Sequence, residues 1–220
     1  FLNRIFFIEK WYFYSYIALY SYRVYLKFMS INISYKNNTI KKNASNLVLF
    51  VDEKFTISKL KKYILSSEYS FISDMLKTTN LKKKIVIFDI SSKKKVILIA
   101  ITKNITSSGV ENLGAQFYDT LKEFKLNEYQ LNSDTVPNNF KNLVAHFLHG
   151  LVLKSYNFEK YKSKKNKKNI SIFVTGKNKP NSKEQLKFKA IEEGSFYTRD
   201  LVSEPGNILH PDEYARRLKS

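Results

Sequence analysis

Two histidines one helical turn apart are the residues of this sequence whose types and spacing could most readily hold a metal ion. His146 and His149 lie in a stretch where apolar residues recur every three or four positions, so we expect a helix there. At about 100° per residue, both imidazoles fall opposite the apolar stripe, which predicts that they face water. A metal site needs further ligands at suitable spacing, and no third ligand stands nearby. We therefore interpret the two histidines as a surface pair.

A second spacing, Gly109-x-x-x-x-Gly114, matches that of a phosphate-binding loop. Ala115 and Gln116 stand where such a loop places Lys and Ser or Thr, so we interpret the glycines as sites of close packing near a helix start. The sequence contains no G-x-S-x-G or H-E-x-x-H segment and no catalytic Ser/His/Asp order. Cysteine is absent, which excludes disulfides and thiolate chemistry and fits a cytoplasmic protein. We assign no catalytic, cofactor-binding or metal-binding residue.

The chain is strongly basic, with a net charge of +19, of which residues 29–220 carry +16. Clustered cations attract nucleic acids and anionic membranes. Only five of the 38 basic residues are Arg, the residue that phosphate and base recognition favours. The abundance of Lys with Asn, Ile, Phe and Tyr is typical of an AT-rich genome, and we favour that explanation. A Lys-rich run is expected to be a solvated loop and the most exposed contributor to weak, sequence-independent DNA binding: Lys164, Lys165, Lys167 and Lys168.

Residues 1–28 differ in composition from the rest, because 12 of them are aromatic and Met29 is the first methionine. Charged residues confine the apolar run to residues 11–22, shorter than the about 20 residues of a membrane span. No small-residue cleavage site follows, as a secretory signal requires. We expect residues 1–28 to be dispensable upstream sequence rather than native coding sequence, with an interfacial aromatic anchor as the alternative. We expect no association with a membrane.

From Met29 onward, short β-rich runs alternate with amphipathic stretches, which predicts a layered α/β fold. The run from Val96 to Ile101 is apolar throughout, as expected of a strand covered on both faces. Six strands are predicted, at residues 31–35, 46–51, 84–90, 95–102, 127–131 and 170–175.

Three helices can be argued one by one between and after these strands. The first begins with a capping box, Ser108-x-x-Glu111, and runs to about residue 124. The second is the histidine-bearing helix, whose apolar face extends from Phe140 to Val152. The third spans about residues 182–203, and Pro205-Gly206 ends it, with Gly206 free to adopt a positive φ. Pro211 suits the first position of a further helix, and residues 176–181 mark a boundary between units.

Two segments resemble the leucyl (cytosol) aminopeptidase family. Residues 150–162, GLVLKSYNFEKYK, are similar to the family's G-L-x-L-x-S-Y-x-F-D-x-Y-K stretch. Residues 199–215, RDLVSEPGNILHPDEYA, resemble its R-D-L-V-N-E-P-A-N-x-L-T-P-E-x-F-A stretch, although His210 replaces a helix-capping Thr or Ser. Residues 111–115 also fit the family. The resemblance covers about residues 111–220, and residues 31–100 agree in the order of elements only.

The resemblance implies a macro-domain-like mixed sheet flanked by helices at residues 29–177. A linking helix and the truncated start of the peptidase domain would follow at residues 178–220. Family members form hexamers and remove N-terminal amino acids from peptides with two divalent ions, Zn²⁺ or Mn²⁺, held in a C-terminal domain. This chain ends before that domain's metal motifs. We therefore expect a segment that is inactive alone and serves folding and assembly.

Two alternatives to that structural role stay open at this point. Some relatives bind DNA, so the Lys-rich surface could make the chain a nucleic-acid-binding module. A macro-like domain could also bind ligands of the ADP-ribose type, although the sequence offers no convincing phosphate loop.

Overall fold

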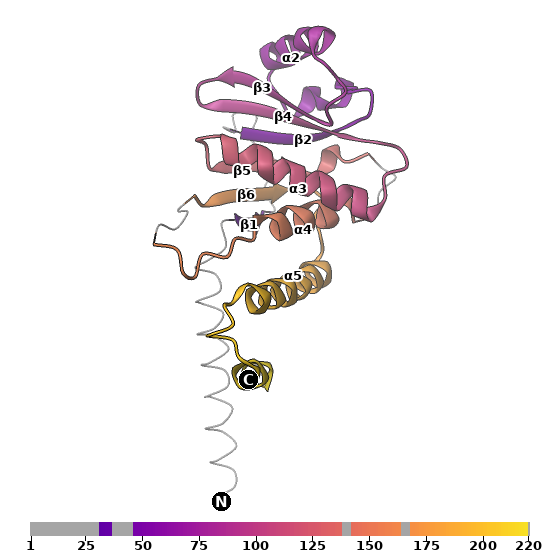
Figure 1. Ribbon diagram of the computed structural model, residues 1–220. Helices are drawn as coiled ribbons and strands as arrows, with labels where there is room; N and C mark the ends of the chain where they lie inside the picture. Colours follow the sequence, from indigo (N-terminus) through magenta and orange to yellow (C-terminus); the bar gives the residue numbers. More distant parts are fainter. Residues whose placement is uncertain (1–30, 37–45, 138–141, 164–167, 220) are drawn as a thin grey trace, which may run out of the picture.

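A computed structural model describes residues 31–36, 46–137, 142–163 and 168–219. Its centre is a six-stranded sheet with the order β1-β6-β5-β2-β4-β3 (Figure 1). All neighbouring strands are parallel except β3 and β4. Every predicted strand is confirmed to within one residue at each end: β1 Ile31–Tyr35, β2 Asn46–Asp52, β3 Ile85–Ser91, β4 Lys94–Ile101, β5 Glu128–Asn132 and β6 Ile170–Thr175.

The sheet is buried on both faces, as the apolar run in β4 predicts. Val96, Leu98 and Ala100 enter one hydrophobic cluster, and the alternating residues Ile97, Ile99 and Ile101 enter the other. This division follows from the two-residue period of a strand, which sends successive side chains to opposite faces. The expected mixed α/β sheet flanked by helices is therefore confirmed.

Helices cover both faces and continue beyond the sheet. The 3₁₀-helix η1 (Ser58–Lys62) and α2 (Ser66–Thr78) pack on one face, and α3 (Ser107–Glu123) and α4 (Leu143–Ser155) pack on the other. A second 3₁₀-helix, η2 (Ser133–Thr135), follows β5. At the end of the chain, α5 (Ser182–Ser203) lies beside α4, and α6 (Pro211–Lys219) lies farther from the sheet (Figure 1).

Two glycines allow α3 and α4 to cross with their backbones in contact. A Cβ placed on Gly114 would lie 2.0 Å from the carbonyl oxygen of Phe147, and one on Gly150 would lie 1.9 Å from that of Glu111. The packing interpretation is thus confirmed for Gly114. Gly109 lies within the first turn of α3, so the two glycines belong to a helix and do not form a phosphate loop.

The predicted capping box of α3 is wrong. Thr106 is the N-cap, and its hydroxyl oxygen accepts a hydrogen bond from the backbone N–H of Gly109 at 3.1 Å. Ser108 lies two residues after this N-cap, inside the helix. Glu111 does not fold back onto a capping residue, because its carboxylate pairs with His146 of α4 instead.

The end of α5 is where the sequence predicts it, but the terminating geometry differs. Gly206 does not adopt a positive φ; among the described glycines only Gly176 does, at 102°. The helix ends because Glu204 is extended, with φ −71° and ψ 137°, as expected of a residue that precedes a proline. Pro211 is the first residue of α6, as predicted.

Candidate functional site

The two histidines of α4 lie between helices and do not face water, so the surface interpretation is wrong. Nδ1 of His149 is 2.9 Å from a carboxylate oxygen of Glu192, and Nδ1 of His146 is 2.8 Å from one of Glu111. Only 7% of the His149 side chain is exposed. Both imidazoles also pack on the ring of Phe188. The apolar stripe of α4 meets the sheet and α3, and α5 covers the side that we expected to be free.

The two histidines pair with separate carboxylates, Glu111 and Glu192. Across the residues that the structure describes, no group of three or more His, Cys, Asp or Glu is placed to hold a metal ion. Burial raises the pKa of Glu192, and the hydrogen bond from His149 opposes this rise. The His149–Glu192 pair therefore fixes α5 on α4, and the His146–Glu111 pair joins α4 to α3.

The structure brings together the two segments that carry the family resemblance. The Tyr156 hydroxyl donates to a carboxylate oxygen of Asp200 at 2.8 Å, and Arg199 Nη1 donates to the carbonyl oxygen of Leu153 at 2.7 Å. Burial, followed by the Asp200 contact, raises the pKa of Tyr156 to about 12, so its hydroxyl stays protonated as a donor. We call these contacts between residues 150–162 and 199–215 the motif junction.

Glu204 is the centre of the motif junction. Its carboxylate accepts hydrogen bonds from Lys160 and Tyr161 of the first segment and from Arg217 of α6. The side chain is 2% exposed, and desolvation alone would raise its pKa. The three hydrogen bonds outweigh that penalty and lower the pKa of Glu204 to about 2. Glu204 thus joins the segment after α4, the end of α5 and α6 through one buried, ionised group.

Apolar side chains remain exposed on α5 and on α6. Only Phe196 and Leu201 of the 22 residues of α5 are buried. Val202 is 82% exposed and Leu186 is 68% exposed. We call the following set the α5–α6 apolar surface: Leu186, Ile191, Tyr197, Val202, Tyr214 and Leu218. Exposed apolar side chains that gather into large patches are typical of surfaces that contact another protein part.

Lys168 is not the freely solvated residue that the charge run predicts. Its ammonium donates to the carbonyl oxygens of Leu121, Lys122 and Phe124, where α3 ends. Carbonyl groups at the end of a helix lack helical partners, and a cation there also complements the helix dipole. Partial burial lowers the pKa of Lys168. Lys164, Lys165 and Lys167, like Phe140 and residues 1–28, lie outside the described residues.

No helix in the described ranges is long and apolar enough to cross a membrane. No family model matches the chain. A probable cytosol aminopeptidase of Clostridium perfringens is 27% identical over 180 residues, which cover 77% of this chain and 34% of that protein. A probable cytosol aminopeptidase of Phytoplasma mali is 40% identical over 83 residues, 34% of this chain and 17% of that protein.

Among solved structures, a mutant of tomato leucine aminopeptidase has the same fold, with a TM-score of 0.68 and 17% identity. The match covers 86% of this chain and 41% of the tomato protein. The chain therefore spans about a third of the Clostridium perfringens protein and about two fifths of the tomato protein. These sequence relatives and the shared fold support a relationship with the leucine aminopeptidase family, whose N-terminal part this chain resembles.

Proposed function

We propose that this chain is the N-terminal, non-catalytic part of a metal-dependent aminopeptidase that removes N-terminal amino acids from peptides. Its own role is structural: it folds as an α/β domain over residues 29–177 and presents residues 178–220 to the peptidase part. The two divalent ions of the reaction, Zn²⁺ or Mn²⁺, would be held by that peptidase part. Assembly into hexamers and a cytoplasmic location belong to the same proposal.

The observation that carries this proposal is the α5–α6 apolar surface. Burying an exposed side chain such as Val202 or Leu218 contributes about 1.5–3 kcal/mol, so an uncovered set of six is costly in water. These side chains lie on α5 and α6, at the C-terminal end of the stretch that resembles the family. The relatives matched along most of this chain are about two to two and a half times as long, which supports their remaining part as the occupant of this surface.

The motif junction supports the same role. Tyr156 and Arg199 join the end of α4 to α5, and ionised Glu204 joins the end of α5 to α6. These contacts support one orientation of the apolar surface relative to the sheet. A rigidly oriented surface loses less conformational entropy when it docks than a flexible one. The contacts among the family-like residues are thus explained as orientation of a docking surface, with no catalytic step assigned to them.

The test is a chimera in which this chain is joined to the part of the Clostridium perfringens relative that it does not match. We expect metal-dependent hydrolysis of leucine amides by the chimera and none by the 220-residue chain with Mn²⁺ or Zn²⁺ supplied. Metal-dependent hydrolysis by the 220-residue chain alone would contradict the proposal that this chain is non-catalytic.

Variants of the chimera test the docking surface itself. Val202→Glu and Leu218→Glu place a charge on the α5–α6 apolar surface and should lower both activity and melting temperature. Phe71→Glu is the matched control, because Phe71 is a similarly exposed hydrophobic residue, 43%, on α2 at the other face of the sheet. If the three variants behave alike, the α5–α6 surface is not the docking surface.

A further inference from the structure

A groove of about 530 Å³ lies between the strand β1 and the helices α4 and α5. In the described sheet β1 pairs only with β6, so the strand forms one border of the sheet. Its alternate residues Ile33 and Tyr35 pack toward the helices but stay only partly buried. On the side of α4 the wall contains Leu148 and Val152, two buried residues one helical turn apart. We call this space the β1–α5 groove.

Helix α5 presents a stripe of three side chains to the groove. Phe188, Glu192 and Phe196 are spaced four residues apart and therefore lie on one side of the helix. Phe196 is buried and Phe188 is half-buried. The carboxylate of Glu192 thus stands between two aromatic residues in a mainly apolar wall, and 13% of its side chain is exposed.

Glu192 has fewer hydrogen bonds than its burial requires. Across the described residues, Nδ1 of His149 is the only hydrogen-bonding partner of this carboxylate, at 2.9 Å. Burial raises the pKa of Glu192, and the contact with His149 does not reverse this rise. At Glu204, by contrast, three hydrogen bonds outweigh burial and lower the pKa to about 2. A cation that reaches the second oxygen of Glu192 would therefore stabilise its ionised form.

The wall of the groove is negatively charged, although the chain as a whole is basic. Glu193 and Lys189 also line the groove and lie 4.0 Å apart, so their charges offset each other. Burial, followed by the charge of Glu192, raises the pKa of Tyr35 to about 12, so the Tyr35 hydroxyl is neutral. With His149 neutral, the net charge of the wall is that of Glu192, in a chain of net charge +19.

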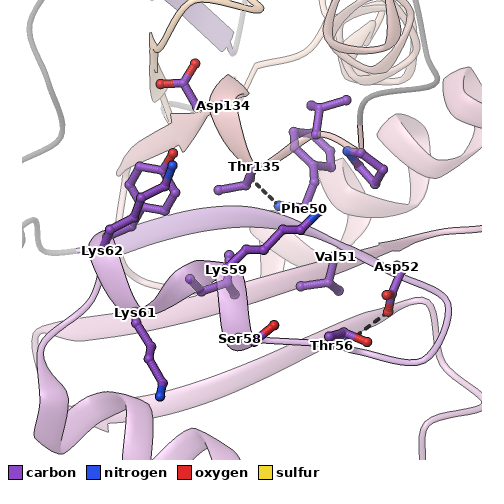
Figure 2. Close-up of a pocket in the computed structure, with 14 residues that line it drawn as sticks. Phe50, Val51, Asp52, Thr56, Ser58, Lys59, Lys61, Lys62, Asp134 and Thr135 are labelled. Atoms are coloured by element: carbon purple, nitrogen blue, oxygen red, sulfur yellow. Dashed lines mark hydrogen bonds between the residues drawn. The ribbon is translucent and has the colours of Figure 1, made fainter.

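A second hollow in the described structure, at the carboxyl end of β2, has the opposite charge. Three lysines line it: Lys59, Lys61 and Lys62 (Figure 2). Asp52 and Asp134, the carboxylates in its wall, both accept hydrogen bonds from backbone N–H groups. A cation therefore prefers the β1–α5 groove to this hollow.

We propose that the β1–α5 groove binds a small primary amine with an aromatic body, which goes beyond the structural role proposed above. The ammonium donates to the oxygen of Glu192 that does not contact His149, and the ring lies against the apolar wall. The ring of Phe188 favours the same end of the ligand, because the face of an aromatic ring attracts an ammonium. The groove volume falls within the range of about 300–1,000 Å³ that is usual for small-molecule sites.

Isothermal titration of the 220-residue chain with tryptamine, tryptophol and indole-3-acetate tests the proposal at neutral pH. The three probes share the indole ring and carry a cation, a neutral hydroxyl and an anion. At about 0.15 M salt, charge interactions longer than about 8 Å are screened. We expect saturable binding of tryptamine, with tryptophol at least about tenfold weaker and indole-3-acetate weaker still, because only the ammonium forms a charge-assisted hydrogen bond with Glu192. If tryptamine does not bind, or if tryptophol binds as tightly, the proposal is overturned.

Carboxylate variants show whether the binding belongs to this groove. Glu192→Gln keeps an acceptor for His149 and removes the charge, so it should weaken tryptamine binding at least about tenfold. Glu53→Gln is the matched control, because it removes the same charge from an exposed residue outside the groove, and it should leave the affinity within about twofold. Equal weakening by both variants would assign the binding to general surface charge and overturn the proposal. Unchanged melting curves confirm that each variant is folded, and if Glu192→Gln unfolds, the three probes on the unchanged chain decide.

A second copy of the chain is the alternative occupant of the β1–α5 groove. Titration with tryptamine at a low and a tenfold higher protein concentration separates the two. A groove that is open to the amine gives the same dissociation constant at both concentrations. If the apparent affinity weakens as the protein concentration rises, another copy competes for the groove and the proposal is overturned.

Discussion

Replacing Gly150 by alanine tests the close crossing of α3 and α4. The added Cβ would lie 1.9 Å from the carbonyl oxygen of Glu111 and 2.6 Å from its Cα. Carbon and oxygen atoms normally approach to about 3.3 Å, so the helices must separate by roughly 1.4 Å. The obstacle is backbone, which cannot rotate away. Overpacking of this kind costs about 3 kcal/mol, and the higher helix propensity of alanine returns up to about 1 kcal/mol.

The expected net loss for Gly150→Ala is therefore about 2 kcal/mol, which lowers the melting temperature of a chain of this size by about 4–8 °C. Gly194→Ala is the matched control, because Gly194 lies inside α5 and its added Cβ would meet nothing within 4 Å. That variant should gain about 0.5–1 kcal/mol and melt at a higher temperature. Thermal unfolding followed by circular dichroism measures both. If the melting temperature of Gly150→Ala is equal to or above that of the unchanged protein, the described crossing of α3 and α4 is wrong.

Four further predictions follow from the described contacts and the composition. The pKa of Glu204 is lowered to about 2 from its ordinary value of 4.5, so its stabilising effect is complete above about pH 5 and disappears as pH falls from 4.5 toward 2. Urea unfolding at several pH values should lose that pH-dependent part in Glu204→Gln, and an unchanged pH profile would contradict it. His149→Ala should lower the melting temperature more than His146→Ala, because 7% of the His149 side chain is exposed against 25% for His146; the reverse order would refute the buried pairing. Deleting residues 1–28 should shift the melting temperature by no more than a few degrees, and a larger drop would show that they pack on the domain. Any DNA binding should be sequence-independent and lost near 0.15 M salt in a titration, and submicromolar, sequence-selective binding there would refute this.

The strands could be predicted from the sequence because their signal is local. An apolar run such as Val96 to Ile101 determines its own burial on both faces, whatever else surrounds it. The boundaries of α5 are also local, since Asn181 and Pro205 mark its ends. Helices η1 and α2 could only be expected in general terms, because the residues between β2 and β3 give no continuous apolar face.

The errors share a physical cause, which is contact with an element distant in the sequence. The side of α4 that carries His149 is polar by pattern, yet it is buried because Glu192 of α5 provides a partner 43 residues away. Lys168 belongs to a charged run in the sequence, yet its ammonium donates hydrogen bonds to carbonyl oxygens at the end of α3.

The pairing of β1 with β6 has a consequence for how the chain folds during synthesis. Ile31 of β1 lies opposite Ile170 of β6, so the first strand must wait for the last. A ribosome adds about 5–20 residues per second, so roughly 7–28 s pass between the synthesis of the two strands. The strands β2 to β5 can assemble within that interval, while β1 has no place in the sheet. Association of the nascent first strand with a chaperone during this delay would prevent its pairing with another chain.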